Sequence, residues 1–92
     1  NAQGKINAAV KIIEDNYKDG QKWIVYCDNI DTQMEILTHR LKANYRILEY
    51  HSRLNQEGRK AVMNHFNMNG GILISVKCLD EGVDIPAVTH AL

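Results

Sequence analysis

Apolar and polar positions alternate along the chain in blocks that predict helices and strands in turn. Between residues 5 and 17, apolar residues recur at spacings of four, three and four, which places them on one face of a helix. These residues are Ile6, Val10, Ile13 and Tyr17. The basic residue Lys18 and the glycine Gly20 that follow are typical of a helix end. The pattern therefore predicts a first helix over residues 5–17.

Three apolar runs follow, and each is typical of a strand in a sheet. They cover residues 23–27, 45–50 and 71–76. Arg46 and Glu49 interrupt the second run, so we expect that strand to be less buried than the first. Residues 88–92 have the apolar character of a fourth strand that is just beginning.

Helical patterns separate these strands. Asp28, Asn29 and Asp31 are good N-cap residues directly after the first strand, and apolar residues at helical spacing follow them. After the second strand, Asn55 is placed to cap a helix with a stripe at every fourth position. The stripe consists of Leu54, Gly58, Val62 and Phe66. Residues 67–70 tolerate a left-handed backbone and end that helix. Strands that alternate with helices predict a three-layer α/β fold with a mainly parallel sheet.

Composition limits the classes of protein to which the chain can belong. Its 92 residues suffice for one small domain. Eleven basic and eleven acidic residues give no net charge, so any contact with nucleic acid must be local. The apolar runs are too short to span a membrane, and no secretory signal is visible. Cys27 and Cys78 lack metal-ligand spacing and are expected as buried thiols in a reduced, cytoplasmic compartment.

Polar residues follow each predicted strand. Asp28 and Asn29 come after the first strand, residues 51–53 after the second and residues 77–84 after the third. In a parallel sheet these three segments meet at one edge, where ligands bind in open α/β folds. The sequence therefore predicts a binding site there.

The residues after the third strand also resemble a helicase motif. Residues 79–86 read Leu-Asp-Glu-Gly-Val-Asp-Ile-Pro, which is similar to motif V of superfamily 2 helicases and translocases. Residues 24–29 resemble motif IV, and residues 50–59 resemble the segment between these motifs, with Gln56 and Arg59 as its Gln-x-x-Arg element. All three stand in the family's order. The resemblance implies the second RecA-like domain of a DEAD/DEAH-like helicase, in a fragment that stops before motif VI.

The resemblance implies two sets of contacts in the parent protein. Gly82 and Asp84 would face a nucleotide held together with an upstream RecA-like domain. The expected contacts to the nucleic-acid backbone are Asn29, His51, Ser52, Arg59, Ser75 and Lys77. Backbone N–H groups and small side chains in these turns would bind successive phosphates.

ATP and Mg²⁺ are the cofactors that the resemblance implies, with Mg²⁺ bound by the upstream domain. The chain has no Gly-x-x-x-x-Gly-Lys-Ser/Thr loop to bind the β- and γ-phosphates, and we expect no metal site within it. The chain ends inside an apolar run, so we expect it to be a fragment. By itself, this fragment is predicted not to hydrolyse ATP.

One residue departs from the DEAD-box pattern. Val76 stands where those proteins carry a threonine, six residues before the motif V glycine. DNA repair and restriction-type relatives share the departure, so the resemblance favours DNA over RNA as the partner.

Alternative interpretations stay open at this stage. The chain is also compatible with the translocase lobe of a restriction or remodelling enzyme that does not unwind. An unrelated flavodoxin-like or receiver-like module with an acidic pocket at Asp28 and Asp31 is another alternative. Structural roles also exist for single residues: a solvated carboxylate for Asp84, an ion pair with Glu57 for Arg59, and core packing for Trp23. For His51 taken alone, a structural role is favoured.

Overall fold

The computed structural model describes residues 2–76 and 90–91. Helices and strands follow one another in the predicted order. In chain order they are helix α1 (Ala2–Asn16), strand β1 (Lys22–Cys27), π-helix η1 (Ile30–Met34), helix α2 (Glu35–Leu41), strand β2 (Ile47–Tyr50), helix α3 (Gln56–Asn69), strand β3 (Gly71–Val76) and strand β4 (His90–Ala91).

The strands form one sheet in the order β2-β3-β1-β4, and every neighbouring pair is parallel. Strand β3 lies between β1 and β2, and all six of its residues are buried. Strand β2 is mostly half-buried, as its interrupted apolar run predicts. Its Glu49 carboxylate accepts a hydrogen bond at 2.8 Å from Thr38 Oγ1 on α2, which satisfies a polar group at this edge of the sheet.

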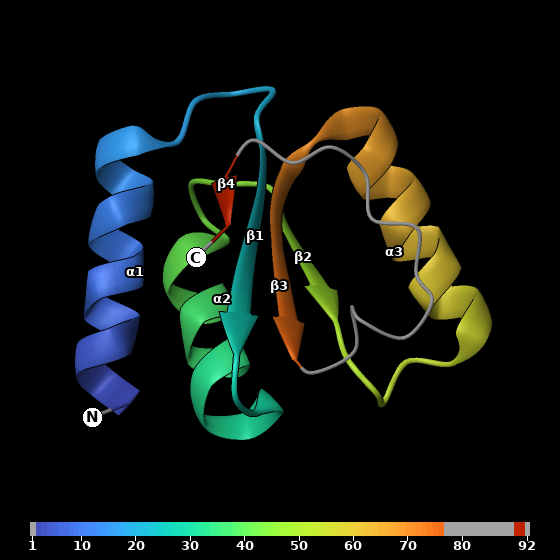
Figure 1. The fold of residues 1–92 in the computed structure, drawn as a ribbon, viewed down its shortest axis with the longest axis horizontal. Coiled ribbons are helices and arrows are strands. Elements are labelled where there is room, and N and C mark those ends of the chain that lie inside the picture. The colour runs from blue at the N-terminus through green and yellow to red at the C-terminus, as the bar shows by residue number, and fades with distance from the viewer. Residues whose placement is uncertain (1, 77–89, 92) are drawn as a thin grey trace.

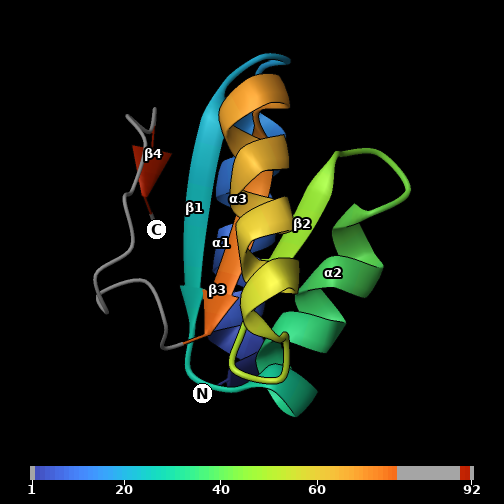
Figure 2. The same cartoon turned by 90° about the vertical axis from the view of Figure 1, so that its right-hand side faces the viewer.

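Helices cover both faces of the sheet, which confirms the predicted three-layer α/β fold. Figures 1 and 2 show α1 and α2 on one side of the sheet and α3 on the other. Two apolar cores result from this arrangement. Trp23 is 1% exposed in the core below α1 and α2, so its predicted packing role is confirmed. Phe66 of α3 is fully buried against Leu73 and Ile24 in the other core.

Glycine and asparagine residues determine where the helices begin and end. Asn55 caps α3 as predicted, because its Oδ1 accepts a hydrogen bond from Gly58 N at 2.7 Å. Gly70 ends α3 with a φ of 71°, a conformation that favours glycine. Gly20, in contrast, does not cap α1. That helix ends at Asn16, and Gly20 lies in the turn before β1 with a φ of 90°.

Candidate functional site

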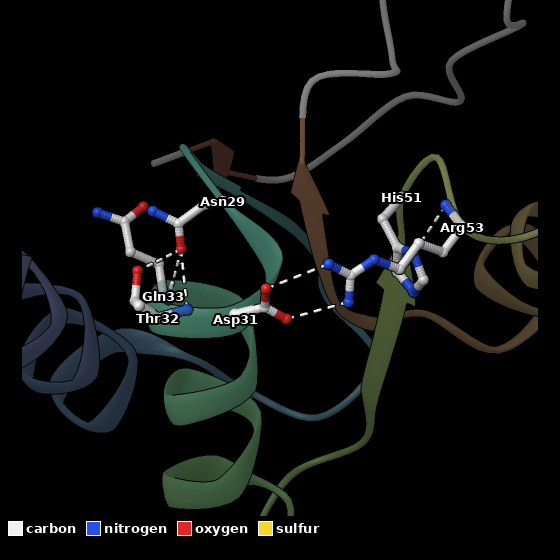
Figure 3. A network of polar contacts seen from close by, with 6 residues as sticks. All are labelled: Asn29, Asp31, Thr32, Gln33, His51 and Arg53. Carbon is white, nitrogen blue, oxygen red and sulfur yellow. Dashed lines mark hydrogen bonds and ion pairs between the residues drawn. The ribbon is translucent and has the colours of Figure 1, made fainter.

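The carboxyl ends of β1, β2 and β3 lie at the same edge of the sheet because the three strands are parallel. Figure 3 shows the polar residues that follow β1 and β2 at this edge. The residues after β3 lie outside the described part of the chain. The predicted contacts of Lys77, Gly82 and Asp84 therefore also lie outside it. The structure therefore describes two of the three turns expected at the site.

The turn after β1 is held by the side chain of Asn29. Its backbone is extended, and its Oδ1 accepts hydrogen bonds from the backbone N–H groups of Thr32, at 2.9 Å, and Gln33, at 3.0 Å. The Thr32 hydroxyl donates to the same oxygen. This oxygen thus caps the helix that follows, while the exposed side chain keeps its amide N–H groups as donors.

The helix after β1 begins with a π-helical turn, which the sequence pattern did not predict. Met34 N donates to Asn29 O at 3.2 Å across this turn. Gln33 is 8% exposed, and its Oε1 accepts a hydrogen bond from Asp28 N at 2.6 Å. Several backbone N–H groups of the turn are therefore used internally. A phosphate bound here would have to use other donors than those of Asp28, Thr32 and Gln33.

His51 organises the turn after β2. Its Nδ1 accepts a hydrogen bond from Arg53 N at 3.2 Å, and its backbone oxygen accepts one from Leu54 N at 3.2 Å. The ring is half-buried, whereas Ser52 is exposed at the tip of the turn. His51 thus has the structural role that its sequence position also allows, and Ser52 is the more accessible of the two predicted contacts.

An ion pair joins the turns after β1 and β2. Nη1 and Nη2 of Arg53 donate to the two carboxylate oxygens of Asp31 at 3.0 and 3.1 Å (Figure 3). These hydrogen bonds, and then the charge of the guanidinium, lower the pKa of Asp31, and the carboxylate raises the pKa of Arg53 in return. Both side chains are exposed, at 60% for Arg53 and 66% for Asp31.

Sequence reasoning did not single out Arg53 or Asp31 as a pair, since the two residues lie 22 positions apart. The available signal was topological. Each follows a predicted parallel strand, so both belong to the same edge of the sheet. No spacing rule within one element identifies such a pair.

Arg59 and Ser75 are less exposed than Asn29 and Ser52. Arg59 is half-buried, and its Nη1 donates to Leu54 O at 2.6 Å. No ion pair joins it to Glu57 in the described part of the chain. Ser75 is 0% exposed within β3, and its Oγ has no hydrogen-bond partner among the described residues. Its predicted contact with phosphate stays a prediction, and the side chain is not displayed at the surface.

Two negative findings concern residues 2–76 and 90–91. Their His, Cys, Asp and Glu side chains form no group of three or more that could hold a metal ion. Their helices also include none with the length and apolar character needed to cross a membrane.

The comparison with protein families identifies the domain. The family model described as the helicase conserved C-terminal domain matches residues 4–92. The chain belongs to this helicase family. An unrelated flavodoxin-like or receiver-like module is thereby set aside, and the motif-based resemblance is confirmed. None of the curated proteins compared with the chain matches it.

Solved structures share the fold of this helicase domain. One is a Saccharomyces cerevisiae Dbp5 variant bound to a Gle1 variant and IP6, with a TM-score of 0.81 and 22% identity over 99% of this chain and 23% of that one. Another is the C-terminal domain of the same protein with the same partners, with a TM-score of 0.77 and 22% identity over 99% of this chain and 51% of that one. The chain thus spans about half or less of these relatives, and the likeness shows a RecA-like fold.

The expectation that DNA is favoured over RNA is wrong. The two solved structures named above are of Dbp5, an RNA helicase. The expectation rested on Val76 in place of a threonine, which concerns a contact to phosphate. Phosphates are common to both nucleic acids, whereas the 2′-hydroxyl distinguishes them. A missing phosphate contact therefore carries no information on the choice between DNA and RNA.

Proposed function

We propose that the chain is the second RecA-like lobe of an ATP-driven, DEAD-box-type helicase. In this proposal it supplies backbone contacts to a nucleic-acid strand and half of an ATP site between two lobes. The observation that carries the proposal is the pair of polar turns after β1 and β2, held at one edge of a parallel sheet in a helicase C-terminal domain. Hydrolysis of ATP would open the lobes and move one of them along the strand.

RNA is the strand that we propose for this edge. The solved relatives of the fold belong to an RNA helicase, which supports this choice. The exposed amide of Asn29 and the exposed hydroxyl of Ser52 are donors suited to phosphate oxygens. Lys77 would add a charged contact after β3, and Arg59 would hold the turn at Leu54 in place.

The nucleotide contacts of the proposal are Gly82 and Asp84. Both would face ATP held by an upstream lobe, which would also bind Mg²⁺. The chain contains no phosphate-binding loop of the Gly-x-x-x-x-Gly-Lys-Ser/Thr type, so the 92-residue chain by itself is predicted to be inactive. ATP and RNA as ligands support an intracellular place of action, for which we propose the cytoplasm.

The ATPase rate of the intact protein tests this proposal. It would be measured without nucleic acid, with single-stranded RNA and with single-stranded DNA. We expect stimulation by RNA, and we expect Asp84→Ala to remove it. Asp19→Ala, an exposed carboxylate before β1, is the matched control and should leave stimulation intact. A rate indifferent to both polymers would overturn the motor function.

Strand displacement by the same intact protein separates unwinding from translocation alone. A helicase separates a short duplex with a single-stranded overhang when ATP is present. A translocase lobe of a restriction or remodelling enzyme would show stimulated hydrolysis without displacement.

A further inference from the structure

Two cations of the described residues, Arg53 and Lys5, are paired with carboxylates that follow β1 at the carboxyl edge of the sheet. Arg53 is bound to Asp31, and Nζ of Lys5 lies 3.9 Å from Oδ2 of Asp28. The chain as a whole carries no net charge that could attract a polyanion. The availability of Arg53 therefore matters for binding at this edge.

We propose that Asp31 is an internal competitor for the phosphates of the bound strand and gates access to Arg53. In the free protein the carboxylate of Asp31 occupies the guanidinium. When a strand binds at the turns after β1 and β2, a phosphate takes the place of this carboxylate. This inference rests on the proposed function, because it assigns a regulation to the same nucleic-acid interface.

The geometry of the pair fits such an exchange. The guanidinium donates through two nitrogens to two oxygens, at 3.0 and 3.1 Å, and a phosphate presents two oxygens in a similar arrangement. The same two donors can therefore serve either anion. Both side chains are mostly exposed, so a phosphate can approach from solvent without displacing apolar groups.

The backbones on the two sides of the pair are fixed independently of it. Arg53 N is bound to His51 Nδ1 in the turn after β2. Asp31 lies in the first turn of η1, which Asn29 caps through Thr32 N and Gln33 N (Figure 3). An exchange of partners therefore requires a rotation of the Arg53 side chain and no change in either turn.

The fold does not depend on the ion pair. Strands β1 and β2 are joined through β3 by backbone hydrogen bonds, and neither Asp31 nor Arg53 is part of the two apolar cores. Exposed ion pairs are screened by water and salt, and they contribute little to stability. A ligand can therefore open the pair at little cost to the stability of the domain.

The gate favours a strand over an isolated anion. A single phosphate gains only the contact with Arg53 and must displace a tethered carboxylate. A strand that also reaches the donors of Ser52 and Asn29 gains several contacts when the same pair opens. Since opening the pair costs the same free energy in each case, a free phosphate or a short oligonucleotide stays weakly bound, whereas the further contacts of a longer strand offset the cost.

Binding of labelled single-stranded RNA to the intact protein, measured by fluorescence anisotropy at several salt concentrations, tests the inference. Four forms are compared: wild type, Asp31→Asn, Arg53→Gln and the double variant. The matched control is Asp15→Asn, which removes the carboxylate of another exposed pair, 3.1 Å from Lys11 on α1. Thermal melting of each form shows that the fold is kept.

We expect Asp31→Asn to bind RNA roughly two- to fivefold more tightly, the factor that corresponds to an exposed ion pair. Arg53→Gln should bind more weakly, and its plot of log K against log salt should be shallower by about 0.7, which is one phosphate contact on a single strand. In the Arg53→Gln background, Asp31→Asn should increase the affinity for RNA by a smaller factor than it does in the wild type. Asp15→Asn should bind as the wild type does.

Competition by inorganic phosphate tests whether the carboxylate of Asp31 also weakens the binding of a free anion to Arg53. With RNA held well below its Kd, phosphate should compete at lower concentration in Asp31→Asn than in the wild type. Equal competition in both forms would overturn the gate.

Three further results would contradict the inference. If Asp31→Asn weakens binding, the pair is a clamp that positions the turns. If wild type binds RNA and Asp31→Asn binds it equally well, the gate is overturned while the proposed function stands. If neither form binds RNA at any salt concentration, the proposed function fails, and the inference fails with it.

Discussion

Single side chains close the ends of helices in this domain, and Asn55 is the clearest case. Its Oδ1 accepts a hydrogen bond at 2.7 Å from Gly58 N at the start of α3. Asn55→Ala is expected to lower the free energy of unfolding by about 1 kcal/mol, because a helix N–H loses its partner. Urea denaturation followed by circular dichroism measures the change. Asn67→Ala, exposed on the same helix, is the control, and an equal loss in both variants would contradict the capping role.

Cys27 provides a prediction that depends on pH. Burial, and then the charge of Asp28, raise the pKa of its thiol to about 11. At pH 8 about a thousandth of the thiol is therefore ionised, and the thiolate is the reactive form. In a Cys78→Ser background, alkylation of the folded protein should be slow and should keep accelerating with pH up to about 11.

The unfolded chain is the control for Cys27. In denaturant the thiol pKa returns towards 9, so alkylation at pH 8 should be roughly a hundredfold faster than in the folded protein. Since the unfolded state releases this proton first as pH rises, stability should fall between pH 9 and 11. A rate that levels off near pH 9 in the folded protein would exclude the raised pKa.

The join between α3 and β3 depends on a glycine. Gly70 has a φ of 71°, and a Cβ at this position would lie 2.9 Å from the backbone oxygen of Gln21. Gly70→Ala combines a strained backbone, about 1–2 kcal/mol, with a steric clash. Gly20→Ala is a matched control because its φ is 90° and its Cβ would meet no atom within 4 Å. Thermal melting should show a larger loss of stability for Gly70→Ala than for Gly20→Ala. Equal losses would mean that backbone strain alone, without the steric clash, determines the effect.

Phe66 is the most completely buried residue of helix α3 against the sheet, with 0% of its surface exposed. Phe66→Ala is expected to lower the free energy of unfolding by about 3–5 kcal/mol, through lost burial and the cavity that remains. Met68→Ala on the same helix removes a side chain that is 84% exposed, and its effect should stay within about 0.5 kcal/mol. Denaturant titrations of both variants make the comparison. A loss below about 1 kcal/mol for Phe66→Ala would contradict the packing shown here.

The order of the elements could be predicted because it depends on local patterns. Continuous apolar runs predicted β1 and β3, and the four-residue stripe ending at Phe66 predicted α3. The π-helical start of η1 was not predicted, because Asn29 caps it as it would cap an ordinary α-helix. The helix-ending role expected for Gly20 was wrong, because α1 ends at Asn16 and Gly20 lies in the turn before β1. A glycine marks a turn, but it does not show on which side of the turn the helix stops.

The position of the candidate site could be predicted from the sequence, but the contacts between its side chains could not. Parallel topology brings the turns after β1 and β2 to one edge, and this follows from the alternation of strands and helices. The pairing of Asp31 with Arg53 depends on side-chain directions across two loops, which no short-range pattern encodes. The burial of Ser75 depends on its place in the central strand β3, where both faces are covered.

The neutral charge of the 92-residue chain sets an expectation for how it binds nucleic acid. Eleven basic and eleven acidic residues give no field that would concentrate a polyanion around the protein. Binding should therefore come from a few local contacts, in which neutral donors such as Ser52 and Asn29 release no counterions. Only Arg53 and Lys77 would neutralise phosphates in the proposed interface.

Two neutralised phosphates on a single strand predict a slope of about −1 to −2 in a plot of log K against log salt. Anisotropy titrations of the 92-residue chain with RNA, between low and physiological salt, measure this slope. A protein that binds through a basic patch would show a much steeper dependence, about −5 or beyond for seven contacts. Such a slope here would mean that the interface lies away from the edge formed by β1, β2 and β3. A shallow slope that Arg53→Gln reduces further would instead locate one of the few charged contacts at the turn after β2.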